Sequence, residues 1–275
     1  MKEKIIGKQG FTLLELMIAL LISTVVMIAI YLTFASQEKS QITQKQITEM
    51  QQNIRAAMHI MSSEIRLAGH DKSLERDADA GLIEAGPGRI RFDMDICLTD
   101  GTLYGDNGTP DDPDDDPVPD EKTDGPNEDV TYAFDDADDA DGDGMIDNAS
   151  ADFEKLVLKR ETCPTDLSCS GLLPFAEFIQ GIRFTYFNAS GNVIAGTGTG
   201  GFLSENQRDQ VRSIRIAILG RTKRDIREIQ DTETYDMNGD APNGTGDVVG
   251  PFNDTFRRRL LITTIKCRNL GVSLE

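Results

Sequence analysis

The N-terminal part of the chain contains an almost unbroken run of apolar residues, 11–35, in which Glu15 is the only charge. The run has no Gly or Pro, and its few hydroxyl side chains are tolerated in a helix. At about 1.5 Å per residue, roughly 25 helical residues extend about 37 Å, enough to cross a hydrocarbon layer of about 30 Å. The pattern therefore predicts a membrane-spanning helix. A cleaved secretory signal fits less well, because its apolar core is only about 7–15 residues long.

Helical spacing continues beyond this run. Polar residues, many of them Gln, Lys and Glu, fill the other faces of an apolar stripe with members three to five positions apart: Ile42, Ile47, Met50, Ile54, Met58, Met61 and Ile65. We expect one helix from about Phe11 to Leu67, membrane-embedded over 11–36 and amphipathic over 37–69, with Gly69 as its C-cap. A Met-rich stripe is able to bind a partner, but packing on a soluble domain is its expected use.

Beyond Gly69 the period changes to short runs that suit β-strands, several of which alternate apolar and polar residues. These runs are 89–98, 130–134, 156–160, 178–187, 211–219 and 260–267. Residues 222–255 show no strong periodicity and are expected to form a long loop. The predicted fold class is α+β, a long N-terminal helix packed on an antiparallel sheet, with residues 70–275 as one β-rich domain.

Charge is concentrated in one segment. The 275 residues carry a net charge of -19, of which residues 106–147, with 16 Asp, 2 Glu and 1 Lys, contribute -17. We therefore treat 106–152 as an acidic insertion in an otherwise nearly neutral domain. This balance argues against a nucleic-acid partner, which requires basic surface to neutralise phosphates.

Part of the insertion has the spacing of an EF-hand calcium loop, with Asp at loop positions 1, 3, 5 and 9 and Gly144 at position 6. Position 12, where a bidentate Glu is expected, holds Ser150, and a later carboxylate would have to replace it in a differently curved loop. Calcium is the expected cofactor, and a solvated acidic loop without an ion is the alternative. The candidate ligands are Asp139, Asp141, Asp143, Met145 through its carbonyl, Asp147 and Asp152.

The four cysteines form an even set in a region that the anchor would place outside the cytoplasm, where disulfides persist. We expect a local bond between Cys163 and Cys169 and a second bond, Cys97–Cys267, between two predicted strands. Free thiols remain an alternative. A zinc site is a weaker one, because five residues separate Cys163 from Cys169, whereas zinc pairs usually have two to four.

No enzymatic signature is found in the sequence. The two histidines, His59 and His70, lie far from any nucleophile motif and are expected to be structural. There is no Walker loop and no dinucleotide-binding fingerprint. We therefore expect a protein that is not an enzyme.

Glu15 requires a partner, because a charge inside a bilayer is costly and is usually kept for function. Cleavage between Gly10 and Phe11 would create an α-ammonium four residues away. The motif Gly10-Phe11-Thr12-Leu13-x-Glu15, preceded by three lysines, resembles the prepilin signal of type IV pilins and type II secretion pseudopilins. The resemblance implies a type IV pilin fold and a leader, 1–10, that a prepilin peptidase removes. It also implies N-methylation of Phe11 and pairing of Glu15 with a neighbouring N-terminus in a filament.

The C-terminal stretch adds a second resemblance. A basic cluster, 257–259, leads into a strand with paired Thr263 and Thr264 that ends in Arg268 and Asn269, which is similar to minor pilins of the PilW type. The resemblance implies a minor pilin with a periplasmic C-terminus. It would stay in the inner membrane until it joins other minor and major pilins in a cell-surface pilus, near the tip, where it would initiate assembly and contact surfaces. Alternatives are a J-type minor pseudopilin of a type II secretion system and a membrane-anchored, calcium-binding adhesive module.

Overall fold

The computed structural model describes residues 11–70, 80–94, 128–147, 153–163, 169–225, 230–238 and 248–271. The predicted leader, Cys97, Asp152 and most of the acidic insertion lie outside these residues. The chain divides into two compact units, one ending at Gln46 and the other beginning at Ile47.

Helix α1 (Leu13–Leu67) is one continuous helix of 55 residues, as the periodicity predicts. It ends where Gly69 adopts a left-handed φ of 71°, and the Gly69 amide donates to the carbonyl of Asp93 at 2.9 Å. This is the predicted C-cap, because a left-handed residue ends a helix and glycine adopts that conformation without a Cβ penalty.

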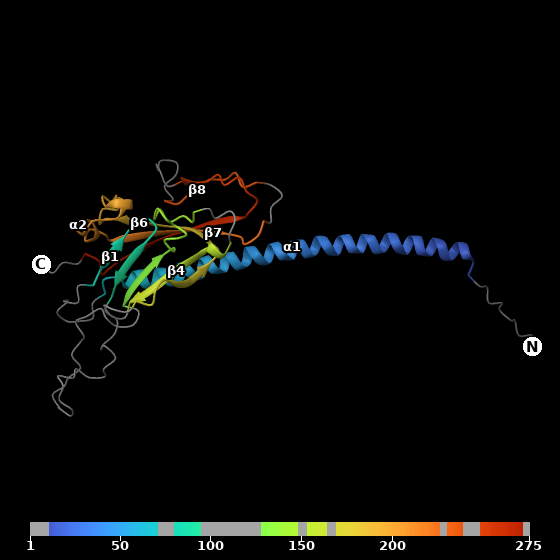
Figure 1. Cartoon of the computed structure of the whole chain (residues 1–275), viewed down its shortest axis with the longest axis horizontal. Coiled ribbons are helices and arrows are strands. Elements are labelled where there is room, and N and C mark those ends of the chain that lie inside the picture. The colour runs from blue at the N-terminus through green and yellow to red at the C-terminus, as the bar shows by residue number, and fades with distance from the viewer. Residues whose placement is uncertain are drawn as a thin grey trace, which may run out of the picture. The chain divides into compact units, whose positions relative to one another are not determined.

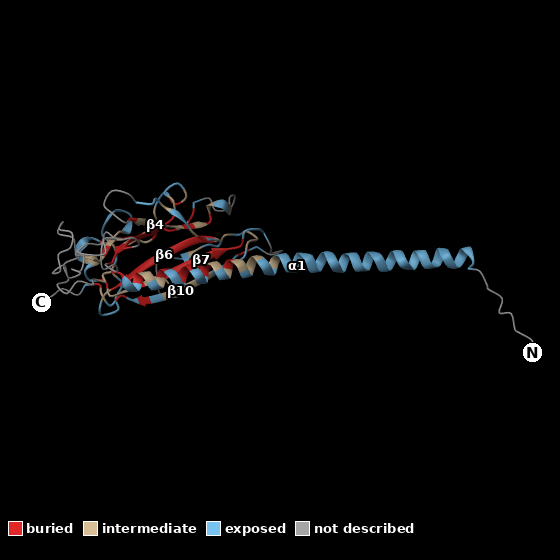
Figure 2. Ribbon diagram, turned by 90° about the horizontal axis from the view of Figure 1, so that it is seen from below, coloured by how far each residue is buried: buried red, intermediate tan, exposed pale blue. Residues whose placement is uncertain are grey.

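The predicted stripe is buried only in the second unit. Its members Met50, Ile54, Met58, Met61 and Ile65 are at most 5% exposed, whereas Ile42 is 46% exposed. Figure 2 shows this change along α1, with buried positions only on its later turns. Each fully buried side chain of this size contributes about 1.5–3 kcal/mol to folding, so core packing explains the stripe.

The first sheet contains five antiparallel strands in the order β1-β2-β3-β4-β5, so consecutive strands are neighbours (Figure 1). The strands are β1 (Leu82–Ala85), β2 (Ile90–Asp93), β3 (Asp129–Ala133), β4 (Val157–Cys163) and β5 (Leu173–Glu177). A 3-10 turn, η1 (Phe153–Lys155), precedes β4. Strand β3 is buried along its whole length and lies at the centre of this sheet.

The second sheet contains three antiparallel strands in the order β10-β7-β6. They are β6 (Ile179–Phe187), β7 (Ser213–Arg221) and β10 (Arg258–Lys266), and η2 (Thr199–Gly201) and α2 (Glu205–Arg208) lie between β6 and β7. A small ribbon pairs β8 (Tyr235–Asp236) with β9 (Val248–Val249) inside the segment predicted to be a long loop.

The predicted α+β class, with a long helix and antiparallel strands, is confirmed. The strands that were expected to form a single sheet form two sheets instead. The chain passes from β5 to β6 at Phe178, a non-glycine residue with a positive φ of 66°. The predicted strand 178–187 therefore begins one residue later, at Ile179, because Phe178 forms the corner between the sheets.

Helix α1 packs against both sheets in the second unit. A Cβ on Gly220 of β7 would lie 2.7 Å from Ile54 of the helix, so only glycine fits there. Glu64 of α1 accepts hydrogen bonds from Arg160 of β4, at 3.0 and 3.2 Å, and from the hydroxyl of Tyr132 in β3. One buried cluster therefore joins the helix stripe to the inner faces of the two sheets.

Candidate functional site

The start of α1 forms a capping box between Thr12 and Glu15. The backbone amide and the hydroxyl of Thr12 each donate to Oε2 of Glu15 at 2.9 Å, and the Glu15 amide donates to Thr12 Oγ1 at 3.3 Å. These reciprocal bonds satisfy backbone donors that the first helical turn leaves without partners. Sequence reasoning missed this role of Glu15, although Thr-x-x-Glu before an apolar run is its known signal.

Phe11 directly precedes the capping residue Thr12 and is 90% exposed. Gly10 lies outside the described residues, so the predicted cleavage site is seen only from its Phe11 side. Both hydrogen bonds from Thr12 use the same oxygen of Glu15, and Oε1 accepts none within the described part of the chain. The arrangement leaves that second oxygen for a cation such as an α-ammonium.

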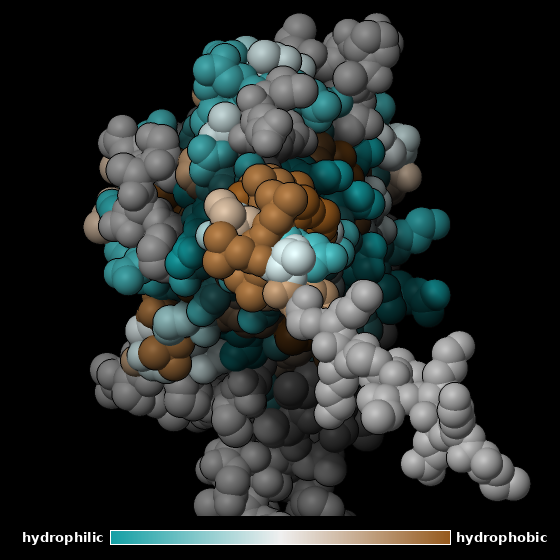
Figure 3. Space-filling view, turned by 90° about the vertical axis from the view of Figure 1, so that its right-hand side faces the viewer, coloured by the Kyte–Doolittle hydropathy of each residue, from teal (hydrophilic) through white to brown (hydrophobic). Residues whose placement is uncertain are grey.

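The apolar part of α1 presents hydrophobic side chains on all its faces. The large apolar side chains of residues 11–34 are 50% to 90% exposed, and hydrophobic residues dominate this part of α1 in Figure 3. By length and composition α1 is able to cross a membrane. Exposure of this much apolar surface to water is unfavourable, so lipid or neighbouring helices are its natural surroundings.

The acidic loop (residues 139–147) brings three predicted ligands together. Asp139, Asp141 and Asp143 each offer a carboxylate oxygen, and these oxygens lie within 4.8 Å of one another. The loop turns at Gly142 and Gly144, which have positive φ values of 70° and 84°. Such grouped carboxylate oxygens on a tight turn suit a hard cation.

Asp139 is the buried member of this cluster, with 8% of its surface exposed. Its Oδ2 accepts a hydrogen bond from the Gly144 amide at 3.0 Å, whereas its buried Oδ1 has no hydrogen-bond partner among the described residues. Burial raises the pKa of Asp139 to about 6, and the charges of Asp143 and Asp141 act in the same direction. An anionic Asp139 therefore lacks a compensating positive charge in this loop.

The other predicted ligands are placed differently. The exposed Asp147 lies outside the close cluster, and its Oδ2 accepts a hydrogen bond from the Ala140 amide at 3.1 Å, which closes the loop. The Met145 amide donates to Asp143 Oδ1 at 2.7 Å. Asp152, the substitute for position 12, lies outside the described residues.

A groove of about 480 Å³ runs beside the acidic loop. Asp141 and Asp143 line it together with Arg183 of β6 and Asn238. The Arg183 guanidinium donates to the Asp143 carbonyl at 3.4 Å. The acidic cluster therefore faces a solvent-accessible space through which an ion is able to enter.

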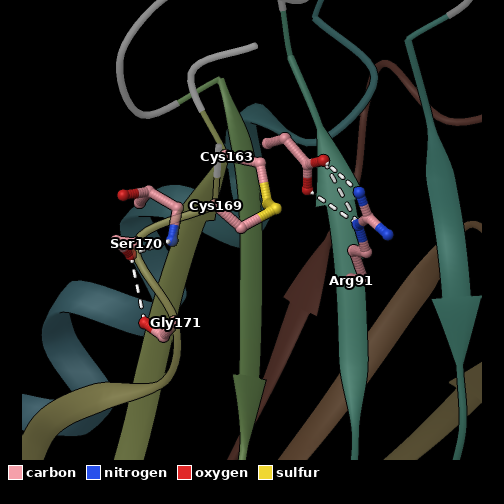
Figure 4. The surroundings of a disulfide bond; sticks show 7 residues. Arg91, Cys163, Cys169, Ser170 and Gly171 are labelled. Carbon is pink, nitrogen blue, oxygen red and sulfur yellow. Dashed lines mark hydrogen bonds and ion pairs between the residues drawn. A yellow bond between two sulfur atoms is a disulfide. The ribbon is translucent and has the colours of Figure 1, made fainter. Parts of the chain in front are cut away.

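Cys163, the last residue of β4, forms a disulfide with Cys169, and the bond closes the connection to β5 (Figure 4). This is the local pairing expected from the sequence. Ser170, next to it, donates from its amide to the Thr162 carbonyl at 3.0 Å. Both sulfurs are consumed in the bond, so their proximity to Glu161 provides no thiolate metal site.

The other expected pairing, Cys97–Cys267, is not formed in the structure, where Cys267 is a buried free thiol. The expectation assumed that both cysteines lie in strands. Strand β2 ends at Asp93 instead, before Cys97, which lies outside the described residues, and Cys267 follows the end of β10. Burial raises the pKa of the Cys267 thiol to about 12.

The two histidines take no part in the acidic cluster. His59 lies on an exposed face of α1 and not on its buried stripe, and His70 is half-buried just beyond the helix end. Neither histidine lines the groove.

Comparison with known proteins relates both ends of the chain to pilus proteins. A model of the prokaryotic N-terminal methylation motif matches residues 7–31, and a model of the type IV pilus-assembly protein W, PilW, matches residues 172–269. No curated protein matches the chain. A solved type IV-like pilin from Thermus thermophilus aligns over 81% of this chain and 98% of its own length, with 11% identity and a TM-score of 0.43.

The two matches confirm the predicted resemblance to minor type IV pilins of the PilW type. The first covers the processing motif and the start of α1, and the second begins just before β5 and extends beyond β10. The methylation motif implies processing by a prepilin peptidase and assembly with other pilins. With the apolar helix, it fits a membrane-anchored pilin, and both models describe structural functions and not catalysis.

Proposed function

We propose that this chain is a minor type IV pilin that a prepilin peptidase processes at Gly10 and that then joins other minor and major pilins. The observation that carries this proposal is the pairing, in one chain, of a methylation motif over 7–31 with a PilW match over 172–269. The inner membrane would hold the apolar part of α1 until assembly, with residues 70–275 in the periplasm. Assembly would then bring the protein to the cell surface.

Glu15 is the proposed assembly contact. Cleavage would place the α-ammonium of Phe11 beside the capping box, where Oε2 of Glu15 already binds Thr12. The other carboxylate oxygen would pair with the N-terminal ammonium of a neighbouring subunit. In a lipid or helix-packed environment of low dielectric, such a pair is much stronger than in water, which favours docking in one axial register.

A minor subunit of this kind would act near the pilus tip, where it would initiate assembly and contact surfaces. The position follows from the resemblance of the C-terminal region to PilW and is part of the proposal. A J-type pseudopilin of a type II secretion system would share the same helix and processing, and it is the second candidate. Deletion separates the two, because loss of twitching supports the pilin and loss of exoprotein export supports the pseudopilin.

We also propose that the acidic loop binds calcium. Three carboxylates converge there, and the buried Oδ1 of Asp139 has no partner among the described residues. Hard oxygen ligands and a flexible glycine-containing loop suit calcium better than magnesium, which demands near-ideal octahedral geometry.

The substitution Glu15→Gln tests the assembly contact. Gln retains the capping hydrogen bonds but removes the charge, so we expect normal cleavage and methylation but loss of the protein from sheared pili. Glu15→Ala should do the same and also lose the cap. Glu38→Gln, an exposed charge removal later in α1, is the matched control.

Two measurements suffice for this test: intact-protein mass spectrometry of the N-terminus and immunoblotting of the sheared pilus fraction. A methylated Phe11 is the expected N-terminus of all the variants. An intact Met1 in the wild-type protein would overturn both filament functions and favour a membrane-anchored adhesive module. Normal incorporation of Glu15→Gln would contradict the proposed charge contact.

A further inference from the structure

The acidic loop links the two sheets. It follows β3, the central strand of the first sheet, yet two of its backbone hydrogen bonds are made with β6 of the second sheet. The Ile146 amide donates to the Gln180 carbonyl at 3.1 Å, and the Ile182 amide donates to the Gly144 carbonyl at 2.8 Å. These two bonds pair the loop with the edge of β6 that faces away from β7.

The loop also touches the turn between β1 and β2. A Cβ added at Gly88 would lie 2.4 Å from the Gly144 amide nitrogen, and one added at Gly144 would lie 2.1 Å from the Ile182 carbonyl oxygen. No side chain fits at either position, so the backbones of the turn, the loop and β6 are in direct contact. Three segments from two sheets thus meet at Gly144.

The pairing with β6 also orients the backbone of Met145. Met145 lies opposite Gly181 in an antiparallel bridge. The hydrogen bonds of this bridge are made by the residues before and after Met145 and by those before and after Gly181. In such an antiparallel pair, the amide and carbonyl of the central residue point away from the partner strand. The Met145 amide does so, because it donates to Asp143 Oδ1 at 2.7 Å. Its carbonyl therefore points to the same side, away from β6, which is the side where Asp143 Oδ1 lies.

The positive group beside the cluster, Arg183 of β6, contacts the Asp143 carbonyl and not the buried Asp139 carboxylate. Asp139, Asp141 and Asp143 converge within 4.8 Å, and the buried Oδ1 of Asp139 has no hydrogen-bond partner within the described residues. Converging carboxylates repel one another, and a buried one is costly unless it is paired or coordinates a metal. Without a cation, repulsion acts on the same loop whose backbone pairs with β6.

We infer that calcium, bound by these three carboxylates and the Met145 carbonyl, is a clasp that holds the acidic loop on β6 and so fixes the junction of the two sheets. This inference rests on the calcium site of the proposed function and adds a structural role for the ion. Removal of the ion frees the loop from β6, while the pairing of β6 with β7 and of β7 with β10 persists.

The test uses the full-length protein in detergent micelles, with calcium chloride, magnesium chloride or a chelator. Isothermal titration measures binding, and hydrogen exchange with mass spectrometry measures the peptides that contain the Ile146 and Ile182 amides. We expect calcium to slow exchange at both amides by at least about tenfold, because local opening controls the exchange of such hydrogen bonds. Peptides of β7 and β10 should exchange at the same rate with and without the ion.

Asp141→Asn combined with Asp143→Asn should abolish both the heat of binding and the protection. Both residues are exposed, so folding should survive, and unchanged exchange in β7 and β10 verifies it. Asp136→Asn is the matched control, since its side chain is 88% exposed and it lies outside the cluster. This control should bind calcium and gain protection like the wild-type protein.

The outcomes separate the site from its role. Absence of a binding heat would overturn the calcium site and the clasp together, without touching the assembly function. Binding without protection at Ile182 would overturn the clasp alone and leave the site. Equal protection by magnesium at the same concentration would overturn the assignment to calcium. Protection at both amides that requires calcium and the two aspartates would support the clasp.

Discussion

Arg258 is the middle member of the basic cluster 257–259, and its truncation is the most informative perturbation of the β-rich domain. Its side chain is 1% exposed, whereas Arg257 and Arg259 are exposed. The guanidinium binds Asp254 with two hydrogen bonds of 2.6 Å and Asp231 with one of 3.1 Å. It also donates to Gln180 at 2.7 Å and stacks on a phenylalanine ring, 3.8 Å from the ring centroid.

The substitution Arg258→Ala would remove the guanidinium that pairs with the Asp231 carboxylate, which is 0% exposed. Removal of one partner of a buried ion pair costs about 3–5 kcal/mol. In a domain of this size, 1 kcal/mol corresponds to roughly 2–4 °C, so the midpoint of thermal unfolding should fall by roughly 6–20 °C. Such a loss is a large fraction of a typical total stability of about 5–15 kcal/mol.

Circular dichroism of the full-length protein in detergent, monitored near 280 nm on heating, measures this midpoint. Arg259→Ala is the matched control, because it removes the adjacent exposed arginine, and it should change the midpoint by less than about 2 °C. Adding Asp231→Asn to Arg258→Ala should restore part of the loss, since the buried charge is gone. Equal midpoints for Arg258→Ala and Arg259→Ala would refute the assignment of a buried ion pair.

Three further changes test other contacts. Glu64→Ala removes the carboxylate that accepts hydrogen bonds from Arg160 and from a tyrosine, between α1 and the first sheet. The free energy of unfolding, measured in urea, should fall by about 1–3 kcal/mol, and an unchanged midpoint would contradict this. Cys163→Ser should cost about 2 kcal/mol, because the bond to Cys169 closes a loop of only about six residues; a matching loss on reduction of the wild-type protein checks it, and no loss in either would count against it. Cys267, buried with a pKa of about 12, should react with iodoacetamide only after unfolding; mass spectrometry locates the label, and rapid native labelling would show the thiol to be accessible.

The helix could be predicted from sequence because its signals are local. The stripe that contains Met61 and Ile65 repeats at helical spacing, and both residues are fully buried in the structure. Ile42 follows the same spacing but is 46% exposed, since the second unit begins only at Ile47. Periodicity identifies an apolar face, but it does not show where that face meets another part of the molecule.

Two strands of the first sheet were missed for local reasons. Strand β1 has only four residues, which is too short for a clear alternation. Strand β5 contains Pro174 and has mostly exposed residues, as an edge strand does. The division into two sheets depends on the corner at Phe178, whose positive φ is unusual for a bulky residue and has no sequence signal.

The candidate sites, too, could be predicted from sequence only where their signals are local. The spacing of Asp139, Asp141 and Asp143 is local, and the three carboxylates do converge. The pairing of this loop with β6, through Gly144 and Ile146, depends on residues about forty positions later, which no local pattern reports. Likewise, three consecutive arginines resemble exposed charges in sequence. Only the packing of the segment before β10 buries the middle one.

Strand β10 brings together distant parts of the β-rich domain, and its late position in the sequence determines when these parts are able to pair during folding. It pairs with the whole of β7, its Arg258 binds Asp231, and Leu270 just beyond it contacts Gly69 at the end of α1. A chain that is translocated with its N-terminal end first therefore exposes one edge of β7 until β10, the last described strand, pairs with it. Unpaired edges attract other chains, and pairing over long sequence distances is slow. We therefore expect the yield of correctly folded protein to depend on how well this edge of β7 is protected, by a chaperone or by rapid release of the chain, until β10 pairs with it.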